Sequence, residues 1–249
     1  MAFEMHPDAP IDDPNLELLL APGSSLGGAR PKANFRDPDG SLWIAKFPSR
    51  TDRADIAAWE YVYAELARKA GIEVAETRLL SLGEGGRTFA TRRWDRDGTS
   101  RRLYVSAMTL TQRSDGEEAS YLDIAQAIRQ FGAAASVRDD HLRNHAFLRT
   151  PAGWRLSPAF DMNPGRAERQ HSISIDGAIT APDIGAALVT RQVYGLSEPR
   201  ARDIIVEVAG VLQRWPELAA SKGIPETERR VIAGALSALP SGLALAVSD

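Results

Sequence analysis

Three polar residues in the middle of the chain have the types and the spacing to carry out chemistry on a hydroxyl group. Asp139 and Asn144 are five positions apart in the run RDDHLRN, and Asp161 ends the run PAFD seventeen positions after Asn144. Carboxylate and amide oxygens are the ligands that Mg²⁺ prefers, and a carboxylate can also accept a proton from an attacking hydroxyl group. The set therefore indicates metal-assisted acid–base chemistry.

The spacing of Asp139 and Asn144 is that of a protein kinase catalytic loop. In kinases the Asp orients and deprotonates the attacking hydroxyl group and the Asn binds a Mg²⁺ ion, so that one loop joins nucleophile and metal. Asp161, which follows a hairpin-like stretch, would hold the Mg²⁺ that bridges the phosphates of ATP. The structural alternative is an ordinary acidic loop at Asp139 and Asp140, with Asp161 capping a turn.

The first third of the chain supplies the groups that a nucleotide would need. Residues 24–32 read SSLGGARPK and end at Lys32, and the small residues around Gly27 and Gly28 would let backbone N–H groups approach phosphate oxygens. Lys46, in the apolar run WIAKF, is placed like the kinase lysine that contacts the α- and β-phosphates, and Glu60 could pair with it. Taken singly, each residue is explained equally well by an exposed surface. The order in the chain (phosphate loop, lysine, helix glutamate, catalytic loop, metal carboxylate) is what favours a nucleotide site.

The elements that must position these residues follow from periodicity. A turn sequence, DPDG, separates the first two extended runs and places Gly40 where a positive φ is needed. Apolar residues at helical spacing predict a helix over 52–70, with caps near Ser49 and Thr51 and an end at Gly71. The strands expected around this helix are 33–36, 42–47, 74–82 and 88–94.

From about residue 105 the pattern becomes helical. The helices predicted there are 121–131, 183–193, 197–214 and 226–238. Between them, the irregular region 136–180 contains short extended pieces at 146–149, 154–156 and 172–175. Most of the unusual polar residues lie in this region, and functional residues are common in loops on a rigid scaffold.

We therefore expect an α+β fold of two lobes, like that of a protein kinase. A small antiparallel β lobe with one helix would occupy residues 23–105, and a mainly helical lobe with the catalytic loop and the metal-binding Asp would occupy 106–249. Residues 1–22 contain four prolines and five acidic groups, which indicates a leader that lies on the fold.

Composition limits the classes of protein that fit. The chain has 249 residues, 43% of them hydrophobic, with a formal net charge of -3, so a nucleic-acid binder that acts through a strong positive field is not expected. There is no cysteine, which excludes disulfides, thiolate metal sites and cysteine nucleophiles. The acidic start does not resemble a secretory signal, and no apolar run is long enough to span a bilayer, so we expect a cytoplasmic protein.

Four segments carry a resemblance to a known family. They read SLGGARPKA from residue 25, YLDIA from 121, DDHLRNH from 139 and LSPAFD from 156. Together they resemble HipA-like serine/threonine kinase toxins over about residues 20–215. The resemblance implies a two-lobed kinase-like fold and transfer of the γ-phosphoryl group of Mg-ATP to a protein serine or threonine.

The resemblance also implies roles for single residues. It makes Asp139 the catalytic base, Asn144 and Asp161 the Mg²⁺ ligands and Lys46 the phosphate lysine, and it places His141 in the loop motif. Ser25, with Ser24 as its neighbour, corresponds to the serine that these kinases autophosphorylate. A phosphate there adds about -1.5 to -2 charges beside the ATP phosphates, so repulsion would expel the loop and silence the enzyme. The family's protein substrate is a translation component such as an aminoacyl-tRNA synthetase, and a DNA-binding antitoxin restrains the toxin.

The chain departs from the family pattern in two places. Typical members carry an N-terminal subdomain, whereas here the Gly-rich segment follows only a short leader, so that subdomain is expected to be absent or supplied by a separate chain. Members also have a long apolar helix before the catalytic loop, but this chain runs from Gly132 through AAASV directly to Arg138. Without that helix we expect less packing beneath the catalytic loop, and displacements of about 1 Å can reduce a rate 10²-fold.

Three alternatives remain open at this stage. A pseudokinase that binds nucleotide or a protein partner is favoured by the missing helix. A small-molecule phosphotransferase would need an acidic pocket from the C-terminal helices, where Glu198, Asp203 and Glu207 lie. A zinc hydrolase would use His141 and His145, which are four positions apart, but no Glu lies between them to act as base.

A basic run surrounds Trp94. It could bind an acidic partner or a phosphoserine, or it could be a solvated strand edge that prevents aggregation. Its arginines are Arg92, Arg93, Arg96, Arg101 and Arg102.

Overall fold

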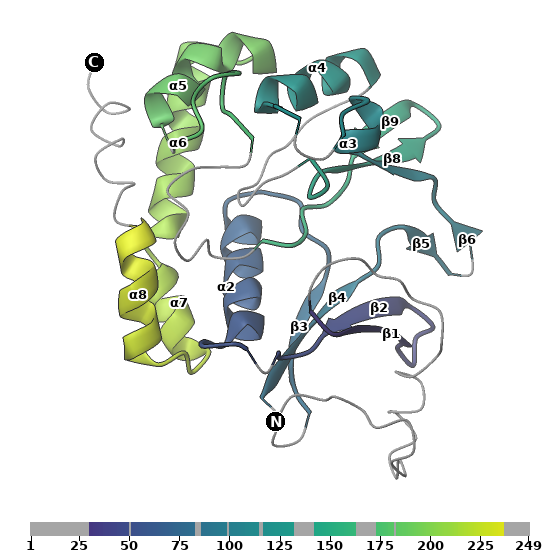
Figure 1. Ribbon diagram of the computed structural model, residues 1–249, viewed down its shortest axis with the longest axis vertical. Coiled ribbons are helices and arrows are strands. Elements are labelled where there is room, and N and C mark those ends of the chain that lie inside the picture. Colours follow the sequence, from purple (N-terminus) through teal and green to yellow (C-terminus); the bar gives the residue numbers. More distant parts are fainter. Residues whose placement is uncertain are drawn as a thin grey trace.

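The structure is a computed structural model that describes residues 30–49, 51–82, 86–98, 100–114, 117–131, 142–162, 173–181 and 183–236 (Figure 1). Its first part is a four-stranded antiparallel sheet in the order β1-β2-β4-β3. The strands are β1 (Lys32–Arg36), β2 (Leu42–Lys46), β3 (Thr77–Ser81) and β4 (Arg87–Arg92). The expected hairpin is confirmed, because Gly40 has a φ of 83° and its N–H donates to the carbonyl of Asp37 at 2.8 Å.

Helix α2 (Ile56–Lys69) follows the hairpin and begins later than the sequence pattern predicts. Asp55 caps it by accepting a hydrogen bond from the N–H of Ala58 at 2.8 Å. The prediction of a start at residue 52 with caps at Ser49 and Thr51 was therefore wrong, because a carboxylate stands closer to the first apolar turn. The helix ends as predicted, with Gly71 at a φ of 77°.

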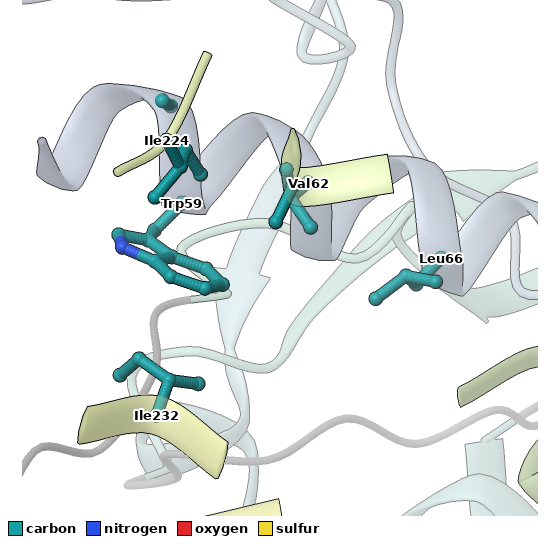
Figure 2. Packing of buried hydrophobic residues seen from close by; sticks show 7 residues of the cluster. Trp59, Val62, Leu66, Ile224 and Ile232 are labelled. Atoms are coloured by element: carbon teal, nitrogen blue, oxygen red, sulfur yellow. The ribbon is translucent and has the colours of Figure 1, made fainter. Parts of the chain in front are cut away.

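Helix α2 lies between the four-stranded sheet and the C-terminal helices α7 and α8 (Figure 1). Trp59, Val62 and Leu66 point from α2 toward Ile224 and Ile232, and together they form the largest buried cluster of this part of the molecule (Figure 2). Full burial of side chains of this size contributes about 1.5–3 kcal/mol each. The face of α2 that carries Glu60 is fixed by this packing.

A second sheet joins the two parts of the chain. It has three antiparallel strands in the order β7-β8-β9: β7 (Tyr104–Ser106), β8 (Ala146–Thr150) and β9 (Gly153–Leu156). Two short elements, β5 (Arg96–Asp97) and β6 (Ser100–Arg101), pair between the sheets, and helices α3 (Ala107–Leu110) and α4 (Tyr121–Phe131) follow β7. Strand β7 was not predicted, because three residues are too few for a periodic signal.

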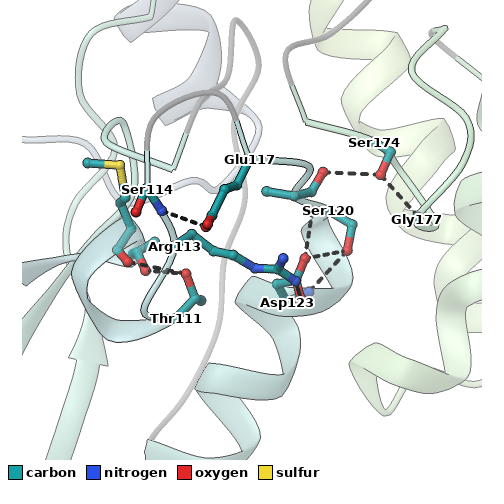
Figure 3. Close-up of polar contacts among 11 residues, drawn as sticks. Thr111, Arg113, Ser114, Glu117, Ser120, Asp123, Ser174 and Gly177 are labelled. Atoms are coloured by element: carbon teal, nitrogen blue, oxygen red, sulfur yellow. Dashed lines mark hydrogen bonds and ion pairs between the residues drawn. The ribbon is translucent and has the colours of Figure 1, made fainter.

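A polar network holds the first turn of α4 (Figure 3). Asp123 accepts hydrogen bonds from the N–H and the hydroxyl of Ser120, at 2.7 and 2.9 Å, and from Arg113 at 3.1 Å. Ser174 forms an isolated bridge with Ser120 and donates its hydroxyl to the carbonyl of Ala119 at 3.1 Å. The segment expected to be extended at 172–175 is thus bound to the start of α4 rather than to a sheet.

The C-terminal part is helical, as expected. Its helices are α5 (Ile184–Val189), the 3₁₀ helix η3 (Thr190–Tyr194), α6 (Glu198–Leu212), α7 (Trp215–Ser221) and α8 (Glu226–Leu236). Helix α7 was missed by the sequence pattern, although Pro216 in its first turn is a recognised start signal. Within the described residues, no helix combines the length and apolar character needed to cross a membrane.

Candidate active site

Lys46 is the centre of a three-residue ion-pair network. From the end of β2, its ammonium group donates to Glu60 of α2 and to Oδ1 of Asp161, the latter at 2.6 Å. The side chain of Lys46 is 12% exposed and that of Glu60 3%, whereas Asp161 is 39% exposed. The ion pair between Lys46 and Glu60 expected from the sequence is therefore present. Of the two carboxylates in the network, that of Asp161 is the more accessible.

Burial and charge set the protonation of this network. Burial acts to lower the pKa of Lys46, but the two neighbouring carboxylates outweigh it and raise that pKa above its ordinary value. Burial raises the pKa of Glu60, and the charge of Asp161 adds to this while Lys46 opposes it. Lys46 therefore stays protonated, and a cation is retained at the point where β2 meets α2.

Local packing explains why Asp161 reaches a lysine so far away in the sequence. Its neighbour Met162 is buried against Ala64 and Ala67 of α2. Two positions before Asp161, the N–H of Ala159 donates to the carbonyl of Glu73 at 2.8 Å. Asp161 itself has a φ of 58°, a conformation uncommon outside glycine. Such strain is found at functional sites, where the surrounding structure has to maintain it.

A second lysine lies beside the network. Lys32 is directly opposite Lys46 in the β1–β2 ladder, so both side chains leave the same face of the sheet. Like charges directly opposite each other destabilise a strand pair. Here the carboxylates of Glu60 and Asp161 balance the charge of Lys46.

Arg30, which follows the Gly-rich segment in the sequence, is clamped to the connection between β2 and α2. Arg30 makes two parallel hydrogen bonds to the carboxylate of Asp52, at 2.6 and 2.5 Å. Asp52 also accepts from the N–H of Ser49 at 2.9 Å, which fixes the connection between β2 and α2. The charge of Arg30 acts on the pKa of Glu60 in the lowering direction, so the clamp lies within electrostatic reach of the network. Sequence reasoning missed both Arg30 and Asp52.

The described end of the predicted catalytic loop is firmly packed. Leu142 is buried in a cluster with Ile124 of α4 and Phe147 of β8. The N–H of Met108 donates to the carbonyl of Leu142 at 3.2 Å, and His145 is buried with its ring against the edge of Tyr121. Helices α3 and α4 thus support residues 142–145. The expected loss of packing beneath the loop does not extend to this part of it.

The predicted site residues fall into two groups. Lys46, Glu60 and Asp161 are brought into direct contact, Lys32 lies opposite Lys46, and Asn144 lies in the turn before β8. The remaining ones lie outside the residues that the structure describes, and their roles stay predictions: Ser24, Ser25, Gly27, Gly28, Asp139 and His141. The Asp161 carboxylate and the Asn144 amide are oxygen donors of the kind that suits Mg²⁺.

An antiparallel sheet whose strand lysine pairs with a helix glutamate, followed by a helical part, defines a kinase-like protein. The chain belongs to the family of the HipA-like C-terminal domain, whose family description matches residues 24–138 and 131–215. The two matched segments overlap at residues 131–138.

Two solved structures share the fold. The Helicobacter pylori proinflammatory kinase CtkA has a TM-score of 0.64 at 15% identity, over 91% of this chain and 95% of that one. HipA of Shewanella oneidensis MR-1, solved with HipB and operator DNA, has a TM-score of 0.61 at 17% identity, over 91% of this chain. The matched region spans 65% of that HipA. No curated protein matches the chain. The predicted α+β, kinase-like fold is confirmed.

Proposed function

We propose that this protein is a HipA-like serine/threonine kinase that transfers the γ-phosphoryl group of ATP to a protein hydroxyl group. The observation that carries the proposal is that Lys46 contacts both Glu60 and Asp161. Kinases require this lysine, its helix glutamate and the metal-binding carboxylate to be in place together.

The residues of the site divide the work. Lys46 and Lys32 would bind phosphate oxygens, and Glu60 holds the ammonium group of Lys46 in position. Asp161 and Asn144 would hold Mg²⁺, which when bound neutralises charge on the phosphates. Asp139 would orient the attacking hydroxyl group and take its proton, with His141 in the same loop motif.

Regulation by autophosphorylation is part of the proposal. Ser25, or its neighbour Ser24, precedes Gly27 and Gly28 in the sequence, and Arg30, which binds Asp52, follows them. A phosphate on either serine would repel the phosphates of ATP and release the segment.

The partners follow from the family. We propose a toxin that acts on a cytoplasmic translation component such as an aminoacyl-tRNA synthetase and that a DNA-binding antitoxin restrains. The complex of the Shewanella HipA with HipB and operator DNA supports the antitoxin.

A catalytically degenerate pseudokinase is the second candidate, because the run from Gly132 to Arg138 is short for the family. A small-molecule phosphotransferase finds less support. Glu198 is paired with Arg191 and Arg202, and Glu207 with Arg200, on the exposed surface of α6. These carboxylates belong to solvated ion pairs rather than to an acidic pocket.

The test is incubation of purified protein with γ-labelled ATP and Mg²⁺, followed by mass spectrometry of the peptide that contains Ser24 and Ser25. We expect incorporation in the wild type and none in Asp139→Ala or Asp161→Ala. ATP-dependent thermal stabilisation without incorporation would instead favour the pseudokinase, since binding to the native state alone raises stability.

A further inference from the structure

A basic cavity lies at the end of the four-stranded sheet where β2 begins and β4 ends. Its volume is about 220 Å³, below the roughly 300–1,000 Å³ of pockets that hold drug-sized ligands, so it suits a small group rather than a nucleotide. It is lined by Ser41, Leu42, Ala75, Glu76, Arg92, Arg93, Trp94, Arg96, Asp97, Gly98 and Arg102. Four of these residues are arginines and two are acidic.

Two of the arginines are held in place by one carboxylate. Arg93 makes two hydrogen bonds to Asp95, at 2.8 and 2.6 Å, and a third to the side-chain oxygen of Asn34 at 2.9 Å. Arg96 contacts the same carboxylate and donates to the backbone carbonyl of Asp95 at 3.0 Å. The guanidinium groups are therefore oriented before any ligand arrives, which reduces the entropy lost on binding.

The other lining arginines are also paired with carboxylates, but arginines outnumber the acidic groups around the cavity. Arg92 forms an ion pair with Glu76 at 3.6 Å, and Arg102 forms one with Asp97 at 3.1 Å. In the β5–β6 pair Arg96 is directly opposite Arg101, a like-charge pairing that destabilises a ladder. In the part of the chain that the structure describes, the side chain of Arg101 forms no hydrogen bond or ion pair. The position favours an anion that would relieve this repulsion.

The strand edge that the sequence suggested accounts for only part of the run: Arg96 and Arg101 lie in the two-stranded sheet β5-β6, where both strands are edges. Arg92 ends β4, which is an interior strand with β2 on one side and β3 on the other. A solvated edge that blocks aggregation is therefore not the role of this residue.

An aromatic wall connects the cavity to the candidate active site. Trp94 packs its ring against Tyr104 at 5.2 Å and against Phe160 at 5.7 Å between centroids. Phe160 directly precedes Asp161. Trp94 is thus placed to report occupancy of the cavity by its fluorescence.

We propose that this cavity binds a phosphate monoester, presented as the phosphorylated side chain of a protein serine. Guanidinium groups match the oxygens of a phosphate dianion, and charge-assisted hydrogen bonds of this kind are about twice as strong as neutral ones. The site is distinct from the Lys46 network, so the proposal does not depend on kinase activity.

The test measures binding without ATP or Mg²⁺. The probes are a short peptide with one phosphoserine, the same peptide with serine or glutamate at that position, and inorganic phosphate. The protein is compared with the double variant Arg96→Gln/Arg102→Gln and with Arg200→Gln, which removes a 52% exposed arginine from α6. Binding is followed by tryptophan fluorescence, and Trp94→Phe shows whether the signal comes from Trp94. Circular dichroism checks the fold of each variant.

We expect the phosphopeptide to bind, the double variant to bind it about tenfold or more weakly, and Arg200→Gln to bind it normally. A second outcome is that inorganic phosphate binds and the phosphopeptide does not, with the same loss of affinity in the double variant. That result would support phosphate binding and identify free phosphate as the ligand. Equal binding of the glutamate peptide, no effect of the double variant, or binding lost only in Lys46→Met would overturn the proposal.

Discussion

The ammonium group of Lys46 and the carboxylate of Asp161 lie 2.6 Å apart, although 115 positions separate them in the sequence. One residue ends the second strand of the first sheet, and the other follows the last strand of the second sheet. Glu60 contacts the same ammonium group from α2. Three separate elements thus bring their charges to one point, and each can be tested on its own.

Glu60→Gln tests the buried member of the network. Breaking a buried ion pair typically costs about 3–5 kcal/mol. Here the cost should be smaller, because Lys46 keeps Asp161 as a partner. In addition, the variant no longer has to bury the charge of Glu60, whose side chain is 3% exposed. We expect a loss of about 2 kcal/mol or less in the free energy of unfolding by urea, together with a more than tenfold fall in phosphoryl transfer. Glu65→Gln on the same helix is the matched control. An active Glu60→Gln would contradict the assigned role.

The clamp between Arg30 and Asp52 is predicted to couple the two residues energetically. A double-mutant cycle with Arg30→Ala and Asp52→Ala should give a coupling energy of about 1 kcal/mol or more, since the pair is bidentate and largely buried. The exposed pair Arg200–Glu207 provides the comparison and should give less than about 0.5 kcal/mol. Equal coupling in the two pairs would show that the clamp is an ordinary surface contact. We also expect the KM for ATP to rise in Arg30→Ala.

Leu142→Ala tests the support of the catalytic loop. The side chain is buried among Ile124 and Phe147, so its truncation should cost about 2–5 kcal/mol and reduce activity per folded molecule. Ile232→Ala, in the cluster on the far side of α2, should cost a similar free energy of unfolding with little change in activity per folded molecule. If both variants retain full activity, the loop is positioned by something other than this packing.

Asp95 predicts a dependence of stability on pH. Burial alone would raise the pKa of Asp95, but the hydrogen bonds and charge of Arg93 and the charge of Arg96 outweigh burial and hold that pKa below its ordinary value. A carboxyl group with a lowered native pKa stabilises the fold above its unfolded pKa, and that contribution is lost as pH falls through the native value. Below about pH 4 the wild type should therefore lose stability more steeply than Asp95→Asn in urea titrations at several pH values. Parallel curves would show that Asp95 does not contribute.

Much of the fold was predictable because its signals are local. Helix α4 coincides with the predicted 121–131, and the first hairpin turns at Gly40 as the DPDG sequence indicates. Strand β7 and the separate helix α7 could not be predicted, since a three-residue strand has no period and depends on β8 for its hydrogen bonds.

The site was predictable in its residue types but not in its contacts. The pairing of Lys46 with Glu60 followed from the order of motifs, whereas the contact with Asp161 depends on Met162 packing against α2. Arg30 lies beside the Gly-rich segment that the sequence singles out. Its partner Asp52 was expected in α2, which begins only at Ile56. Such pairings need the tertiary structure, because nothing in the spacing of the two residues specifies them.

The most direct test of the proposed site is a calorimetric titration of ATP into the protein, with and without Mg²⁺. We predict that Mg²⁺ strengthens binding to the wild type and to Lys69→Met, an exposed lysine at the end of α2. In Asp161→Asn the effect of Mg²⁺ should disappear, and in Lys46→Met the affinity should fall at least about tenfold under both conditions. Wild-type affinity and full Mg²⁺ dependence in both Asp161→Asn and Lys46→Met would contradict the assignment of this network as the phosphate and metal site.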